Sequence, residues 1–158
     1  MLPILAVLSL MACSEPGFVR IGFAKRLSLE VPDYLELASG MHPEHSLQMS
    51  NVYDGVYLLA RFDTLKEGEH DLEAYYLNTF QQVLPGVPVP YPDTIRVDGH
   101  LGLHVQTEGS FANRNLIYDL SLIQTQQYLY QILLWTEKKE AEDYLMDFER
   151  IRTSFQEL

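Results

Sequence analysis

The chain has 158 residues, of which 47% are hydrophobic and 21% charged, a composition typical of one globular domain and not of a disordered segment. Eleven lysines and arginines face 22 aspartates and glutamates, so the formal net charge is −11. Nucleic-acid binding and peripheral binding to an anionic membrane surface both need clustered cations. The lysines and arginines of this sequence do not cluster, so we expect no nucleic acid among the partners. The single cysteine excludes an internal disulfide.

The first twelve residues, MLPILAVLSLMA, carry no charged side chain. The run is too short for a membrane-spanning helix, which needs about 20 apolar residues, but it has the length of the apolar region of a secretory signal peptide. A buried N-terminal strand or helix is the alternative. Pro3 is unfavourable inside a strand, and the polar SEPG at 14–17 is unfavourable for a continuing helix. Residues 1–12 are therefore predicted to be a signal peptide.

Residues 10–13, LMAC, resemble a bacterial lipobox, with Leu10 and Ala12 ahead of Cys13. The resemblance implies cleavage before Cys13 and attachment of diacylglycerol to its sulfur, because a thiolate is a competent nucleophile near neutral pH. The usual Lys or Arg before the apolar run is missing, which indicates a start further upstream or a weak signal. An ordinary signal peptidase site would need a small residue where Leu10 stands. We expect a lipid at Cys13 that anchors the chain to a membrane, and a lipidated tether over 13–17.

Residues 18–158 contain no repeat and no low-complexity stretch, and they are predicted to form a single domain. The first half is expected to consist of short strands separated by turn signals. These strands are 18–24, 27–31, 46–51 and 55–62. Pro32 ends the second strand, and a helical turn is expected over 33–38. Both faces of strand 55–62 are apolar, so we expect it to be covered on both sides.

A helix is predicted over 71–84, where apolar residues recur at helical spacing. The proline-rich segment 85–93 is expected to be an extended surface loop, because proline removes a backbone donor. Beyond it, strands 94–97 and 100–106 flank the pair Asp98-Gly99, which is typical of a type I′ hairpin turn.

Two longer strands, 115–124 and 127–136, are predicted next. In the first, Asp119 and Ser121 alternate with apolar residues, so one face is more apolar than the other. Both faces of the second are apolar, which indicates a central position in a sheet. A helix with an apolar stripe is predicted over 137–155. The order of elements predicts an α+β fold, an antiparallel β-sheet flanked by helices.

Five segments in chain order carry a family resemblance: LSLEVPDYLEL, NVYDGVYLLARFD, VDGHLGLHVQTEG, NLIYDLSLIQTQQYLYQILLWT and IRTSF. Together they resemble the PsbP/Mog-like fold superfamily, and within it the small bacterial lipoproteins of the DcrB type. The resemblance covers residues 18–157 and implies an α-β-α sandwich with a non-catalytic binding or assembly role. No binding motif of the family can be placed residue by residue on this chain, so the expected partner is an envelope protein of unknown identity.

The best metal candidate is His42-Pro43-Glu44-His45, which has two imidazoles and a carboxylate within four residues. The spacing and the internal proline do not fit the helical zinc motif, in which histidines stand at i and i+4. A loop site completed by Glu69 or His70 would make the chain a metal-dependent hydrolase, and a small-ligand carrier is a further alternative. A polar connection between strands is the simpler interpretation, so no metal and no cofactor are predicted.

His100 and His104 share one face of a strand, opposite three apolar residues, and are expected to be solvated or half-buried. With Cys13 assigned to lipid and no Gly-x-Ser-x-Gly elbow in the sequence, we expect no catalytic residue and no enzyme activity. The predicted function is a non-catalytic binding or assembly role in the bacterial cell envelope, outside the cytoplasm. Ser14, directly after the cysteine, slightly favours the outer membrane.

Overall fold

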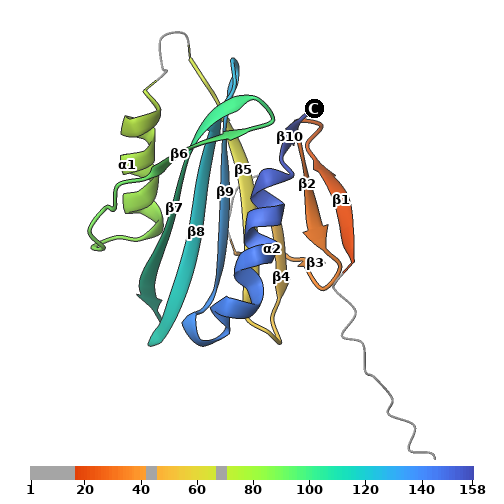
Figure 1. Cartoon of the computed structure of the whole chain (residues 1–158), viewed down its shortest axis with the longest axis vertical. Helices are drawn as coiled ribbons and strands as arrows, with labels where there is room; N and C mark the ends of the chain where they lie inside the picture. Colours follow the sequence, from red (N-terminus) through yellow and green to blue (C-terminus); the bar gives the residue numbers. More distant parts are fainter. Residues whose placement is uncertain (1–16, 42–45, 67–70) are drawn as a thin grey trace, which may run out of the picture.

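The computed structural model describes residues 17–41, 46–66 and 71–158. These residues form two antiparallel sheets and two α-helices (Figure 1). The small sheet, in the order β1-β2-β10, consists of β1 (Phe18–Phe23), β2 (Leu27–Pro32) and β10 (Gln156–Glu157). The large sheet has the order β3-β4-β5-β9-β8-β7-β6. Its strands are β3 (Glu36–Leu37), β4 (Leu47–Asn51), β5 (Val56–Thr64), β6 (Asp93–Val97), β7 (His100–Phe111), β8 (Arg114–Gln124) and β9 (Tyr128–Glu137).

The helices are α1 (Leu72–Val83) and α2 (Ala141–Thr153), with a short 3-10 turn, η1 (Lys138–Glu140), before α2. They pack on opposite faces of the large sheet and define two hydrophobic cores. α2 and the small sheet share one core with β5 and β9, and Figure 1 shows α2 in front of the large sheet and beside the small one. α1 packs on the other face, mainly over β7 and β8. The α+β class with an antiparallel sheet flanked by helices is confirmed.

Helix α1 confirms the prediction for 71–84. The Asp71 side chain caps its N-terminus by accepting from the Ala74 backbone N–H at 2.9 Å, which satisfies a donor that has no partner within the helix. Tyr76 and Phe80 are buried on its inner face. Among the described residues, neither helix is long and apolar enough to cross a membrane.

The central strands of the large sheet are buried on both faces. In β9 this holds along nearly the whole strand, and in β5 over residues 58–60, as their apolar sequences predict. In β8, Asp119 and Ser121 share one face as predicted, but both are buried, with exposed fractions of 5% and 0%. They are removed from water because α2 packs over this face of β8.

Two tight turns determine where β7 begins and ends. Asp98 and Gly99 have φ angles of 50° and 80°, as a type I′ turn requires at both central positions, so the predicted hairpin is confirmed. At the other end, Ala112 and Asn113 have φ angles of 50° and 63°. Alanine rarely adopts this conformation, and the sequence therefore gives no signal for this turn. As a result β7 extends to Phe111, beyond the strand expected over 100–106.

The segment after β2 differs from the expected helical turn over 33–38. Asp33 and Tyr34 form a turn, and the chain then continues as the two-residue edge strand β3. Strand pairing takes the place of helical bonding here, because Glu36 and Leu37 lie in register with Ser50 and Met49 of β4.

The last helix is shorter than the expected range 137–155. It ends at Thr153, and the chain then turns so that β10 pairs with β2. Phe155 therefore lies beyond the helix, yet it is buried in the same core as Phe148.

A hydrogen bond joins α2 to the turn after β2. The hydroxyl of Tyr34, in that turn, donates to Oδ2 of Asp147, in the helix, at 2.7 Å. Burial and this hydrogen bond raise the pKa of Tyr34 far above its usual value, so the hydroxyl remains a donor.

The close packing of β7 against β8 leads to a stability prediction at Gly102. A Cβ atom at this position would lie 2.6 Å from the backbone oxygen of Leu122 and 3.1 Å from Cγ1 of Ile95. Because a strand backbone cannot move aside as a flexible side chain can, Gly102→Ala is expected to lower the free energy of unfolding by about 1–3 kcal/mol. Equilibrium urea unfolding measures the change.

Gly22→Ala is the matched control. Its Cβ would meet only Cδ1 of Leu158 at 3.6 Å, an ordinary contact, so the stability change should stay below about 1 kcal/mol. Equal losses in the two variants would show that the close approach at Gly102 carries no cost.

Candidate functional site

Several sequence-predicted site residues lie outside the described part of the chain. They are Cys13, His42, Glu44, His45, Glu69 and His70. Within residues 17–41, 46–66 and 71–158, no group of three or more His, Cys, Asp or Glu side chains is arranged to hold a metal ion. The lipid site and the metal-dependent alternative therefore stay predictions.

The two strand histidines are half-buried on the α2 face of the large sheet. His100 Nε2 lies 3.8 Å from Glu157 Oε2, and His104 Nε2 lies 2.9 Å from Asp119 Oδ2. From α2, Arg152 Nη1 lies 3.7 Å from the same Asp119 oxygen. Asp119 thus joins β7, β8 and α2 in one buried charged cluster, which the sequence does not predict because its members come from three separate elements.

Asp119 and His104, together with Ser121, are the residue types of a serine-hydrolase triad. His104 and Ser121 are direct partners in the β7–β8 register. Ser121 is however fully buried, and its hydroxyl has no hydrogen-bond partner among the described residues. A nucleophile must reach both its base and a substrate, and this serine reaches neither. Ser121 is therefore not placed to act as a nucleophile, and the ion pairs of the cluster hold α2 against the sheet.

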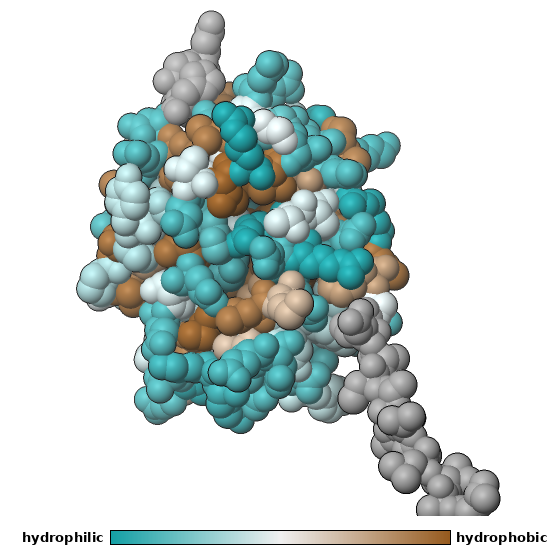
Figure 2. Space-filling view, in the orientation of Figure 1, coloured by the Kyte–Doolittle hydropathy of each residue, from teal (hydrophilic) through white to brown (hydrophobic). Residues whose placement is uncertain are grey.

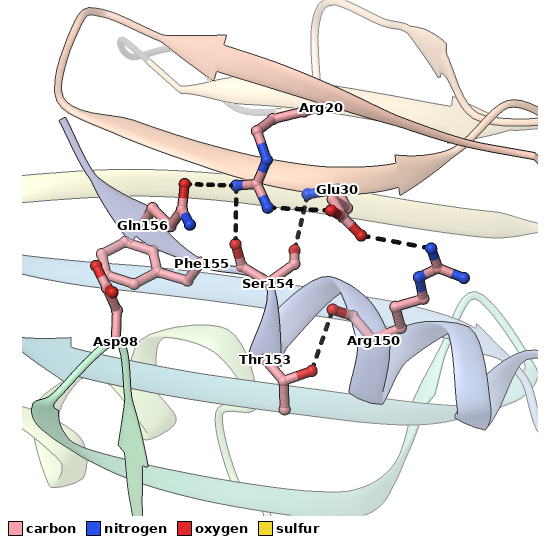
Figure 3. A pocket seen from close by; sticks show the side chains of 8 residues that line it. All are labelled: Arg20, Glu30, Asp98, Arg150, Thr153, Ser154, Phe155 and Gln156. Atoms are coloured by element: carbon pink, nitrogen blue, oxygen red, sulfur yellow. Dashed lines mark hydrogen bonds and ion pairs between the residues drawn. The ribbon is translucent and has the colours of Figure 1, made fainter.

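A polar pocket of about 290 Å³ lies where the small sheet meets the end of α2 (Figure 3). Arg20 donates to Ser28 Oγ at 3.0 Å and to the Ser154 backbone oxygen at 3.1 Å, and it pairs with Glu30 at 3.1 Å. Arg150 pairs with the other Glu30 oxygen at 3.4 Å. Both arginines and Glu30 already have partners. We therefore interpret the residues of this pocket as contacts that hold the small sheet against the end of α2.

The surface over α2 is mainly hydrophilic, with separate hydrophobic areas (Figure 2).

A larger cavity of about 720 Å³ lies on the opposite face of the large sheet, next to α1. We call it the trough. Side chains of β5, β8 and β9 line it, together with Gln82 and Val83 at the end of α1 and with Phe111 and Ala112 at the β7–β8 turn. Its volume lies within the range of about 300–1,000 Å³ that is usual for small-molecule sites. The trough is the strongest candidate binding site among the described residues.

The register of the strands arranges the floor of the trough in rows. In one row, Tyr57 is the partner of Trp135 and Trp135 is the partner of Tyr118. The rings of Tyr57 and Trp135 stack, with centroids 5.1 Å apart and 11° between their planes. The neighbouring row pairs Leu59 with Leu133. Burial raises the pKa of Tyr118, so its hydroxyl stays neutral, and the floor is apolar and uncharged.

The two ends of the trough are polar. At one end Arg61 Nε donates to Gln131 Oε1 at 2.9 Å. At the other end Arg114 Nη1 pairs with Glu137 Oε1 at 2.9 Å. Gln131 and Glu137 are both in β9, six residues apart, which corresponds to about 20 Å of strand. The trough therefore suits an elongated ligand with an apolar body, and the described residues that line it include no histidine, cysteine or serine that could begin covalent chemistry.

Sequence reasoning identifies the strands of the trough but not the trough itself. The signal that could have found it is the doubly apolar pattern of 55–62 and 127–136, which predicts coverage on both faces. α1 contacts mainly β7 and β8, so its coverage does not extend fully over β5 and β9. The trough thus depends on where α1 is placed, which no short segment of sequence encodes.

No protein-family model and no curated protein matches the sequence. Solved structures do match the fold. CyanoP, a cyanobacterial PsbP from Synechocystis sp. PCC 6803, is 10% identical with a TM-score of 0.68, over 92% of this chain and 95% of that chain. LpqN of Mycobacterium tuberculosis, described as involved in cell envelope biogenesis, is 15% identical with a TM-score of 0.63, over 83% and 82%. A protein of unknown function from Pseudomonas aeruginosa is 14% identical with a TM-score of 0.54, over 87% and 94%.

These similarities show that the chain has a PsbP-like fold, as the sequence resemblance predicts. At 10–15% identity they carry no residue-level assignment, because a fold supports many unrelated functions.

Proposed function

We propose that the chain is an extracytoplasmic protein of the bacterial cell envelope, held at a membrane by lipid on Cys13, with a non-catalytic binding role. The trough is the observation that carries this proposal, because its apolar floor and polar ends are the properties of a binding site. The lipobox-like LMAC supports the anchor. The envelope role of LpqN, a protein of similar fold, supports the location, and Ser14 favours the outer membrane.

The described structure is consistent with a domain that works at the end of a tether. The first strand, β1, begins at Phe18, five residues beyond Cys13. Among the described residues, both hydrophobic cores are built from residues later than 17. The proposed partners are the membrane, through the lipid, and an envelope component that the trough receives.

Cys13→Ser is expected to abolish incorporation of labelled palmitate in a bacterial host and to leave an unprocessed precursor. The reason is that a serine hydroxyl is not ionised near neutral pH and cannot replace the thiolate as acceptor. Labelling followed by gel electrophoresis of membrane and soluble fractions measures both effects.

Ser14→Ala is the control, because it changes the neighbouring residue and leaves the thiol in place. It should be labelled like the unchanged chain. Equal labelling of Cys13→Ser and the unchanged chain would refute the lipid anchor, whatever the trough binds.

A further inference from the structure

The trough contains one cation whose charge is not balanced within the described part of the chain. Arg61 uses Nε to donate to Gln131, and no described carboxylate pairs with its two terminal nitrogens. In contrast, Arg114 at the far end is paired with Glu137. In a chain with a net charge of −11, a half-buried arginine without a counter-charge among the described residues, at the end of an apolar floor, is the group most able to select a ligand.

Arg61 is held in a fixed orientation. It follows Leu59 on the same face of β5, and its register partner is Gln131. The hydrogen bond to Gln131 restrains the plane of the guanidinium group and leaves the two terminal nitrogens for a second partner. A guanidinium fork matches the two oxygens of a carboxylate, and such charge-assisted pairs are the stronger class of hydrogen bond.

From these observations we infer that the trough binds a fatty acid. Its carboxylate pairs with Arg61, and its aliphatic chain lies over Leu59, Leu133 and the Tyr57–Trp135 stack. The inference rests on the proposed binding role and names the ligand class. The length of about 20 Å between the polar ends along β9 accommodates an extended chain, and each buried methylene contributes about 0.8 kcal/mol.

The charges fix both the orientation and the headgroup. At the far end Arg114 is already paired with Glu137, so the headgroup lies at Arg61, whose terminal nitrogens have no described carboxylate partner. One guanidinium balances one carboxylate, whereas a phosphate monoester would bring a second negative charge into a strongly acidic chain. A cationic headgroup would be repelled by Arg61. The trough therefore distinguishes amphiphiles by the charge of their headgroup as well as by their hydrocarbon chain.

Trp135 provides a direct readout because it is the sole tryptophan of the chain and lies in the floor of the trough. The protein for the test is the full chain with Cys13→Ser, so that no covalent acyl group competes for the site. It is titrated below micelle-forming concentrations with four amphiphiles that share a decyl chain: decanoate, decyl glucoside, decyl phosphate and decyltrimethylammonium. Saturable changes in Trp135 fluorescence give the Kd values.

Decanoate is expected to bind at least about tenfold more tightly than the cationic amphiphile, because the charged pair with Arg61 is made only with the anion. Arg61→Gln should weaken decanoate binding by about tenfold or more and leave decyl glucoside binding unchanged. Arg61→Lys should recover part of the loss, since it restores the charge but not the fork. Arg96→Gln, in β6 and outside the trough, should have no effect.

Three results would overturn the inference. The first is the absence of a saturable fluorescence change with decanoate. The second is equal decanoate affinity in Arg61→Gln and the unchanged chain, with both variants folded by circular dichroism. The third is decyl phosphate binding at least about tenfold tighter than decanoate. None of these three results depends on the palmitate labelling at Cys13. Failure of the ligand assignment can therefore be distinguished from failure of the proposed anchor.

Discussion

Phe148→Ala is expected to lower the free energy of unfolding by about 3–5 kcal/mol. Phe148, in α2, has no exposed surface and packs in the core that α2 shares with the small sheet and the large sheet. Its truncation removes apolar contacts and leaves a cavity that three packed elements cannot close together. Equilibrium urea unfolding followed by Trp135 fluorescence gives the value, with the slope of the transition as a check that the unfolded state is unchanged.

Met146→Ala is the matched control on the same helix, because Met146 is 82% exposed. Its stability should change by no more than about 0.5 kcal/mol. If Phe148→Ala also cost less than about 1 kcal/mol, α2 would not be packed against the sheet as described.

Asp119→Ala is expected to have an effect of similar size, about 3–5 kcal/mol, because it leaves Arg152, whose side chain is only 12% exposed, without its counter-charge. Asp119 Oδ2 also accepts from His104 Nε2 at 2.9 Å, so the same change removes the group that joins β7 to α2. Thermal or urea unfolding measures the loss. Glu108→Ala is the control: its ion pair with Lys138 is solvent-exposed and should contribute at most about 1 kcal/mol.

A double variant tests the physical reason for this effect. When Arg152→Met is added to Asp119→Ala, no unpaired charge stays buried, so the combined loss should be clearly smaller than the sum of the two single losses. Strict additivity would mean that the 3.7 Å approach of Arg152 to Asp119 carries no coupling, and that the cluster does not hold α2.

The strands and helices are predictable from sequence where local patterns decide them. The helical spacing of 71–84, the Asp98-Gly99 turn and the doubly apolar strand 127–136 each depend on neighbouring residues alone, and each agrees with the structure. Prediction fails where a distant partner decides the outcome. Glu36 and Leu37 form a strand because β4 lies beside them, and Phe155 leaves the helix because β10 pairs with β2.

The candidate site is less accessible to sequence reasoning than the fold. Arg61 is one of 11 lysines and arginines, and nothing in its immediate sequence distinguishes it from the others. Its importance comes from the β5–β9 register, which places it beside Gln131, and from α1, which contacts mainly β7 and β8. Asp119 is similar, since its alternation with apolar residues predicts only that its face of the strand is the less apolar one, and the packing of α2 makes it buried.

The anchor at Cys13 is the reverse case. It is predicted from four consecutive residues, LMAC, and from the absence of charge in the twelve residues that begin the chain. Recognition by processing enzymes depends on the linear sequence and not on a folded surface. The evidence for the anchor is therefore local, while the evidence for the binding role is entirely three-dimensional. The two halves of the proposal are independent for this reason.

The intact mass of the protein, purified from the membranes of a bacterial host, tests the proposed envelope role most directly. The proposal predicts a mass equal to residues 13–158 plus a diacylglycerol group, with or without a further acyl group on the new N-terminus. The mass of the unmodified chain of 158 residues, recovered from the soluble fraction, would contradict it.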